Sequence, residues 1–419
     1  MRPDSRKDPA AGVVVLKSVA TSPHHGILGI ARSLGRLGVD VHIASPDPAV
    51  ETRSRFARRW FAWTLEDGGE QSLARLDAIG EELGGGQLIV PVDDSAAAFV
   101  DRHADSLGDR FVFPRQPRDL VRTLSSKRAL HDLCRSHDVP TPHTAFPESE
   151  ADAEAFALAI GYPVVVKRAE GWRQVRRANA PSVVIAHDPA ALRSAYGDLD
   201  GREGPNAVLQ EYVPGGARSI WMFNGYFDER SDCLFHATGQ KIRQAPPHTG
   251  ATTLGVCRAN AEVATTTKRL FKALGYRGIV DLGYRFDARD GAYKLLDVNP
   301  RIGSTFRLFA TRDGVDVVRC LYRDLGGRPL SSSAPEDGRR WLVEDLDLLS
   351  SLRYHREGTL SMRQWLSSIR GVEELAWYAA DDLAPAAALI RVRAAQTLRR
   401  RRRRASRMTE PASERSEDA

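Results

Sequence analysis

Short apolar runs alternate with helix-length amphipathic segments along the first part of the chain. Residues 12–16 and 88–92 predict buried strands, residues 27–37 have the periodicity of a helix, and residues 39–43 predict a further strand. This βαβ alternation indicates an α/β domain with a parallel sheet. A dinucleotide site is not predicted, because no G-x-G-x-x-G pattern and no acid at a ribose-binding spacing follow the first strand.

Polar side chains stand at the expected carboxyl ends of these strands. His24 and His25 follow the first strand, and Asp93 and Asp94 follow the strand at 88–92. Open α/β sheets bind ligands at this edge. We therefore take these four residues as candidates for recognising an acceptor substrate.

The run Lys294-Leu-Leu-Asp-Val-Asn-Pro-Arg301 reads as a strand with a polar face. Strand side chains alternate, so Asp297, Asn299 and Arg301 point the same way. Carboxylate and amide oxygens are ligands that Mg²⁺ prefers, and a guanidinium holds phosphate with a planar fork of donors. The trio predicts a nucleotide-phosphate site, and a polar edge strand ending at a proline is the alternative.

Lysine is rare in this chain, which has eight lysines among 60 basic residues. Lys127 opens an amphipathic helix, and Lys167 ends the β-branched run at 162–167, which predicts a buried strand. Lys241 lies in a further strand, with Arg243 expected on the same face. Each of these lysines alone fits a solvated surface position. Their order along the chain and the residues around them favour contacts with phosphate.

Residues 208–216 form an apolar strand that runs into a Pro-Gly turn. Pro214 removes one backbone donor and the glycines allow positive φ, so the backbone bends and exposes its own polar groups. Such a hinge is able to read an adenine edge with main-chain atoms. An ordinary hairpin turn fits the spacing equally well.

These segments, in this order, resemble the ATP-grasp superfamily over roughly residues 12 to 325. Lys127 and Lys167 match its two phosphate-contacting lysines, and the "P-V-V-V-K" strand carries the second of them. The strand with Asp297, Asn299 and Arg301 matches the family pattern "hydrophobic-E-x-N-x-R", with aspartate in place of glutamate. The resemblance implies ATP and Mg²⁺ or Mn²⁺ as ligands, with Asp297 and Asn299 on the metal.

The same resemblance assigns the hinge. Gln210, Glu211 and Val213 match its adenine-binding segment, which implies contacts from the Glu211 carbonyl and the Val213 amide.

Three departures from the family pattern change the expectations. The loop at 168–177 has one glycine and four arginines where a glycine-rich lid is usual, so its role is either a cationic lid or a holder of an acidic acceptor. No acid follows the hinge at 215–220, which leaves ribose binding unassigned. The second metal-binding position falls near Gly283, which has no side chain, and Asp281 lies two residues earlier on the same strand face. Asp281 is a metal ligand if the register shifts or a bulge re-aims it, and otherwise orients Arg285 or Arg301.

The chain has 419 residues and a net charge of +6, which arises at the C-terminus. Nine arginines and no acid lie between 391 and 407, so the remainder carries about −3, and no specific nucleic-acid partner is expected. The apolar stretch before this block is too short and too interrupted to span a bilayer. It fits either an anionic membrane surface or a disordered tail.

Cysteine usage and the N-terminus point to a reducing compartment. The four cysteines are scattered without paired spacing, so neither a disulfide framework nor a zinc site is predicted. The first residues lack the apolar core of a signal peptide. We expect a cytoplasmic protein, either free or peripheral at the inner membrane face, and a homodimer stays open.

The fold class expected is α/β (α+β) in five parts. These are a half-Rossmann pre-ATP-grasp domain at 12–120, a small ATP-grasp subdomain at 121–207, a large subdomain with the metal site at 208–330, a helical appendage at 331–398 and a basic tail at 399–419.

The function that this resemblance implies is a carboxylate-amine ligase that makes an acylphosphate from a small carboxylate and ATP. Lys127 and Lys167 would hold the α and β phosphates, while Arg301 with Lys241 or Arg243 would stabilise the transferred phosphoryl group. Three alternatives remain: an ATP-grasp carboxylase, another phosphoryl transferase, and a non-catalytic ATP-binding protein.

Overall fold

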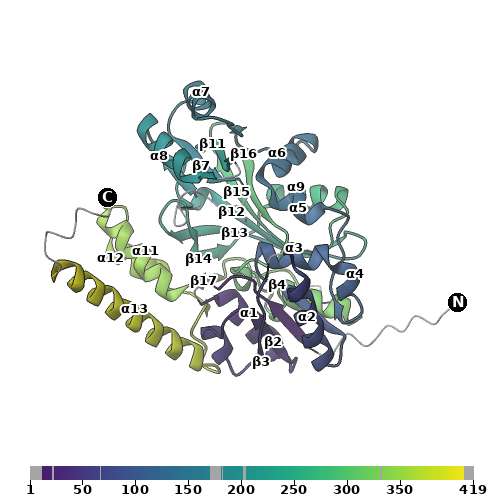
Figure 1. Ribbon diagram of the computed structural model, residues 1–419. Helices are drawn as coiled ribbons and strands as arrows, with labels where there is room; N and C mark the ends of the chain where they lie inside the picture. The colour runs from purple at the N-terminus through teal and green to yellow at the C-terminus, as the bar shows by residue number, and fades with distance from the viewer. Residues whose placement is uncertain are drawn as a thin grey trace.

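The computed structural model describes residues 12–20, 23–66, 68–169, 181, 183–201, 204–330 and 333–409. Its architecture is mixed α/β, with three main sheets (Figure 1). The four cysteines are free thiols.

The N-terminal sheet has five parallel strands in the order β3-β2-β1-β4-β5. The strands are β1 (Val13–Leu16), β2 (Val41–Ser45), β3 (Ala57–Ala62), β4 (Gln87–Pro91) and β5 (Phe111–Val112), and the helices are α1 (His25–Gly35), α2 (Glu70–Glu82), α3 (Asp94–Arg102) and α4 (Ala104–Leu107), with the 3-10 turn η1 (Val50–Arg53). The β-branched residues of β1 are fully buried, because helices cover both faces of a parallel sheet. The expected βαβ opening is confirmed.

A small antiparallel sheet follows, in the order β6-β11-β7-β8. It consists of β6 (Thr144–Ala145), β7 (Val164–Arg168), β8 (Val183–Ala186) and β11 (Ala207–Glu211), accompanied by α5 (Leu120–Ser125), α6 (Lys127–Ser136), α7 (Glu150–Ile160), α8 (Pro189–Leu199) and the short pair β9 (Asp200–Gly201) and β10 (Gly204–Pro205). The predicted Lys127 helix and Lys167 strand are α6 and β7. The strand leading into the hinge belongs to this sheet.

The large sheet has seven strands in the order β16-β15-β12-β13-β14-β17-β18. It contains β12 (Ile220–Phe227), β13 (Cys233–Ala245), β14 (Ala251–Cys257), β15 (Gly278–Asp287), β16 (Ala292–Asn299), β17 (Arg340–Leu342) and β18 (Glu374–Leu375), with α9 (Ala261–Ala273), α10 (Val317–Leu325) and the 3-10 turns η2 (Ala217–Ser219) and η3 (Phe306–Leu308).

The C-terminal region is joined to this sheet more closely than an appended helical unit would be. Strands β17 and β18 extend the sheet past β14, and α11 (Glu344–Arg356) and α12 (Met362–Ile369) follow β17 and precede β18. The helix α13 (Ala384–Thr409) runs through the arginine block, so residues 399–409 are helical where disorder was one expectation. None of the described helices is both long enough and apolar enough to cross a membrane.

Two buried carboxylates fasten this C-terminal region to the rest of the protein. Asp382 accepts hydrogen bonds from Arg32 Nε of α1 at 3.0 Å and from the Ser54 hydroxyl at 2.7 Å. Asp347 of α11 accepts hydrogen bonds from Nε and Nη2 of Arg243, at 2.8 and 2.9 Å. Unpaired buried charge is costly, so these contacts hold α11 and the chain before α13 in fixed positions.

Candidate active site

A cavity of about 410 Å³ lies between the small and the large sheet. Side chains of β7, β11, β13, β15 and β16 line it, together with the hinge after β11. Most of the predicted site residues meet here. Lys167, Gln210, Glu211, Val213, Lys241, Asp281, Asp297, Asn299 and Arg301 all line this one cavity.

The hairpin of β15 and β16 brings two carboxylates and an amide together. Its register pairs Gly283 with Asp297 and Asp281 with Asn299, so the expected opposition of Asp297 and Gly283 is present. The irregularity in the pairing falls between Gly283 and Tyr284, and it leaves Asp281 directly opposite Asn299. Asn299 Nδ2 donates to Asp281 Oδ2 at 3.3 Å. The shift of register that the sequence analysis required is therefore present, and it places Asp281 beside the amide.

The acidity of the two carboxyls differs. Burial raises the pKa of Asp281 to about 6, partly offset by Arg301. Burial also acts on Asp297, yet the Lys127 ammonium, which donates to Asp297 Oδ1, holds the pKa of that carboxyl below its usual range. The Lys127 ammonium thus already contacts Asp297. The negative charge that binds this ammonium is equally suited to a divalent cation.

Asp281, Asp297 and Asn299 are a donor set that fits Mg²⁺, which takes one or two carboxylates and keeps several waters. Within the described part of the chain, no group of three or more His, Cys, Asp or Glu residues is arranged to hold a metal.

Two lysines bring positive charge into the cavity. Burial lowers the pKa of Lys167 to about 8, and that of Lys241 to about 8 as well. Lys241 Nζ donates to the Gly250 carbonyl at 3.0 Å, a neutral partner. A polyanion in the cavity would raise the pKa of both ammonium groups again and so favour their charged form.

The hinge closes one end of the cavity. The Glu211 amide donates to the His143 carbonyl, and the Glu211 carboxylate accepts from Lys294 Nζ at 2.7 Å, so its side chain is committed to the protein. Arg285, not singled out from the sequence as a site residue, lines the cavity; its guanidinium carbon lies 5.3 Å from the Tyr212 ring centroid and its Nη2 donates to the Gly215 carbonyl. The sequence signal that could have indicated Arg285 is its position in the strand, two residues after Gly283.

Arg301 connects the cavity to the N-terminal sheet. Its Nη2 donates to Asn299 Oδ1 at 3.1 Å, and its Nε donates to Asp94 Oδ1 at 2.8 Å. Asp94 opens α3 and was an acceptor-site candidate from sequence. Asp93 has a different role, because it accepts from Ser18 and caps α3 through the Ala96 amide at 2.9 Å.

Arg243 does not join the cavity, so its predicted place beside Lys241 is wrong. The pairing of β13 with β14 is irregular on both sides of Arg243, and the strict alternation of faces is lost there. Its guanidinium is buried against Asp347 of α11 and donates to Ser368 Oγ at 2.6 Å. The residue is a structural anchor instead.

His24 and His25 are packed within the protein. His24 Nδ1 accepts from the Ile27 amide at 3.2 Å and caps α1, and burial lowers its pKa to about 3. The His25 ring lies 5.4 Å from Trp341 and 5.8 Å from Trp377, between ring centroids. Neither histidine lines the cavity, so their expected part in acceptor recognition is replaced by packing.

His25 is expected to make the fold acid-sensitive. Burial lowers its pKa from 6.5 to about 4, so the folded state keeps it neutral while the unfolded chain takes up a proton. Its contribution is complete above pH 6.5 and is lost as the pH falls toward about 4. We predict that His25→Phe flattens the fall of the thermal midpoint across this window. His187→Phe, at an exposed position, is the control, and an unchanged slope for His25→Phe contradicts the prediction.

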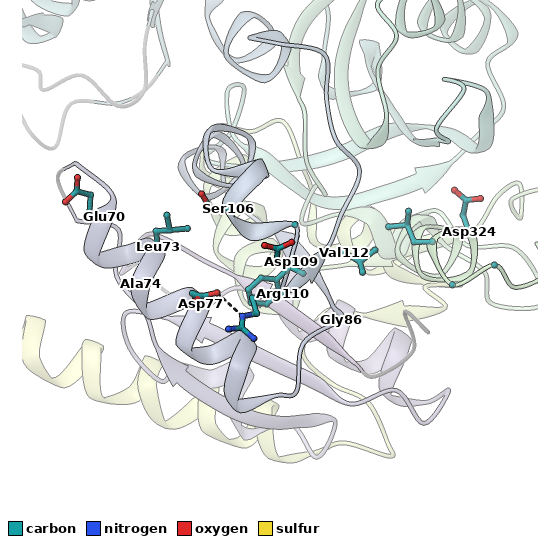
Figure 2. Close-up of a pocket in the computed structure, with 15 residues that line it drawn as sticks. Glu70, Leu73, Ala74, Asp77, Gly86, Ser106, Asp109, Arg110, Val112 and Asp324 are labelled. Atoms are coloured by element: carbon teal, nitrogen blue, oxygen red, sulfur yellow. Dashed lines mark hydrogen bonds and ion pairs between the residues drawn. The ribbon is translucent and has the colours of Figure 1, made fainter. Parts of the chain in front are cut away.

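Most of the predicted lid at 168–177 lies outside the described residues, which end there at Ala169. A larger open groove of about 1320 Å³ lies elsewhere, beside α2, β5 and the end of α10. Figure 2 shows its acidic lining, with Asp77 paired to Arg110 at 3.2 Å. None of the predicted site residues lines this groove, so we assign it no function on the basis of its volume.

Curated relatives match about half of the chain. D-aspartate ligase of Enterococcus faecium is 22% identical over 245 residues, 57% of this chain and 58% of that protein. Biotin carboxylase of Pseudomonas aeruginosa is 24% identical over 232 residues, 53% and 50%. The chain thus spans little more than half the length of these relatives, and no family model matches it.

Solved structures extend the likeness over most of the chain. N5-carboxyaminoimidazole synthetase from Staphylococcus aureus, complexed with ADP, aligns with a TM-score of 0.61 at 12% identity, covering 83% of this chain and 86% of that one. L-amino acid ligase from Bacillus licheniformis aligns with a TM-score of 0.55 at 17% identity, covering 77% and 75%. The fold is therefore that of ATP-grasp proteins, and the sequence is similar to theirs over about half of the chain.

Proposed function

We propose that this protein is an ATP-dependent ligase that joins a small carboxylate, activated as an acylphosphate, to an amine. The main observation behind this proposal is that two half-buried lysines, Lys167 and Lys241, meet Asp297 and Asn299 at one cavity. The relatives named as D-aspartate ligase and L-amino acid ligase favour an amino acid as one substrate.

Each residue of the cavity has a distinct part in this reaction. Asp297, Asn299 and Asp281 would hold Mg²⁺ or Mn²⁺, which would neutralise the negative charge on phosphate when bound. Lys127 and Lys167 hold the α and β phosphates. The backbone of the hinge from Gln210 to Val213 contacts adenine, and the apolar wall from Val165, Ile185 and Leu296 accepts the base.

Arg301 and Lys241 act on the reacting groups. A carboxylate oxygen attacks the γ-phosphorus, ADP leaves, and the two cations stabilise the phosphoryl group in transfer. The amine then attacks the acyl carbon, phosphate leaves, and the amine gives up a proton. Arg301 also contacts Asp94, so the acceptor would lie between the cavity and the N-terminal sheet.

The test is ADP release by the purified protein with Mg-ATP and single amino acids, D and L, alone and in pairs. Release that requires an amino acid, with a condensed product in the mass spectrum, supports the ligase. Release that requires bicarbonate points to the carboxylase alternative. ATP binding without release under any of these conditions overturns an enzymatic role.

Lys167→Ala is expected to remove most ATP affinity and keep the fold, since the side chain contributes charge at the end of β7. Mg-ATP at a hundredfold excess over its Kd stabilises a protein by about 2.7 kcal/mol, a shift that a thermal scan detects. Lys272→Ala, an exposed lysine paired with Asp232, is the control. An equal Mg-ATP shift in wild type and Lys167→Ala assigns Lys167 a structural role only.

We also infer a cytoplasmic location at an anionic membrane surface. Nine arginines without an acid between 391 and 407 would attract such a surface at low salt, an attraction that salt screens. Because Leu389 is buried and Arg393 pairs with Asp345, the chain should be shortened after Leu398, which removes the seven arginines between 399 and 407. A protein shortened there that binds anionic vesicles as the full chain does overturns this part.

A further inference from the structure

Helix α11 turns its polar side toward the protein and its apolar side toward the solvent. The side that packs on the large sheet is polar, with Asp347, Ser350 and Ser351 all buried. Its other side exposes three leucines, and Leu348, Leu349 and Leu352 are 47%, 55% and 40% exposed. Asp347 turns the polar side inward, because it accepts from the buried Arg243 and Thr253. These three leucines therefore take no part in the hydrophobic core of the protein.

The neighbouring helices continue this apolar surface. On α12, Trp365 Nε1 donates to Asp347 and Ser368 Oγ accepts from Arg243, so both side chains face inward. Met362 and Leu366 of the same helix are 46% and 50% exposed. Of the fourteen large hydrophobic side chains exposed on the described part of the chain, nine lie between residues 348 and 398. Such concentration in one region of the chain differs from the singly scattered exposure that is usual on a protein surface.

Helix α13 covers only the first turn of α11. Arg393 Nε donates to Asp345 Oδ2 at 2.9 Å, and Val392 and Leu346 both pack against the same hydrophobic core. Farther along, the α11 leucines stay exposed although α13 continues to Thr409, a length of about 39 Å in total. Figure 1 shows α11, α12 and α13 gathered on one side of the molecule.

The exposed charge on this side is positive. Between residues 348 and 370 the chain carries Arg353, Arg356, Arg363 and Arg370 but a single acid, Glu357. That acid faces His248, whose Nε2 lies 3.1 Å from its carboxylate. The arginine-rich continuation of α13 adds further charge of the same sign. We call Leu348, Leu349, Leu352, Met362 and Leu366, with these four arginines, the appendage face.

We propose that the appendage face inserts into the surface of an anionic lipid bilayer. Its leucines and methionine would enter below the headgroups while its arginines meet lipid phosphates, the pattern of interfacial helices. A second copy of this chain is a poorer occupant, because a two-fold contact would set arginines against arginines. This inference does not depend on the ligase activity, and it adds an apolar contact to the attraction of the arginine block.

The test uses the full-length chain and co-sedimentation with vesicles of equal parts phosphatidylcholine and phosphatidylglycerol. The double variant L349Q/L352Q keeps every arginine and removes two apolar side chains. Its affinity for these vesicles is expected to fall roughly tenfold or more. Leu158→Gln, at a leucine of α7 that is 78% exposed and outside the face, should bind as wild type does.

Three results would overturn the proposal. They are wild-type protein that ignores the vesicles at low salt, an L349Q/L352Q variant that binds as tightly as wild type, and a wild-type dimer that the double variant dissolves. The last outcome would make the face a contact between copies. Unchanged thermal midpoints and unchanged ADP release in both variants show that the loss of vesicle binding is not a loss of fold or of the proposed ligase activity.

Discussion

Asp297→Asn is expected to lower ADP formation by roughly a thousandfold, the scale on which removal of one preorganised charge acts in a catalytic site. Asparagine offers one neutral oxygen and cannot balance a divalent ion on phosphate. It also releases Lys127, which donates to Asp297 in the unliganded protein. The fold should survive, because Asp297 faces the cavity and its side chain is 43% exposed.

Two variants sharpen this experiment. Asp290→Asn, in the turn between β15 and β16, removes an exposed acid near the same hairpin and should leave turnover unchanged. Asp281→Asn should also impair turnover and raise the Mg²⁺ concentration needed for half-maximal rate, since Asp281 lies opposite Asn299. Turnover of Asp297→Asn within about tenfold of wild type would remove Asp297 from the metal site.

Asp347→Ala is expected to cost about 3–5 kcal/mol of the free energy of unfolding, because it strands a buried guanidinium. The side chains of Asp347 and Arg243 are 2% and 5% exposed. Thr253 Oγ1 and Trp365 Nε1 also donate to this carboxylate, at 2.9 and 3.1 Å. Urea unfolding followed by tryptophan fluorescence measures the change, provided the transition is two-state.

Asp381→Ala is the matched control for that measurement. Asp381 pairs with Arg36 at the surface, where both side chains are at least one-third exposed, so its loss should cost less than about 1 kcal/mol. A double variant that replaces Arg243 by methionine and Asp347 by leucine should recover part of the stability, since no charge is then left buried alone. Equal losses for Asp347→Ala and Asp381→Ala would contradict the anchoring role.

Local pattern was sufficient for the parts of the site that lie on single elements. The β-branched run before Lys167 and the alternation through Asp297 and Asn299 predicted strands and faces, because side-chain direction in a strand follows from position alone. Lys127 at the start of α6 followed from helical periodicity in the same way. Asp297 and Asn299 stand opposite Gly283 and Asp281 because β16 pairs with β15. Lys127 and Lys167 reach the same site from a helix and from a different sheet.

Long-range contacts decided the rest. Arg243 has the same sequence spacing to Lys241 as Asn299 has to Asp297, yet irregular pairing of β13 and a carboxylate 104 residues away turn it out of the cavity. Likewise Arg301 reaches Asp94 across 207 residues. Period and spacing determine the face of a residue within its own element, whereas the charge it meets depends on which distant element packs there, and only the tertiary structure decided that.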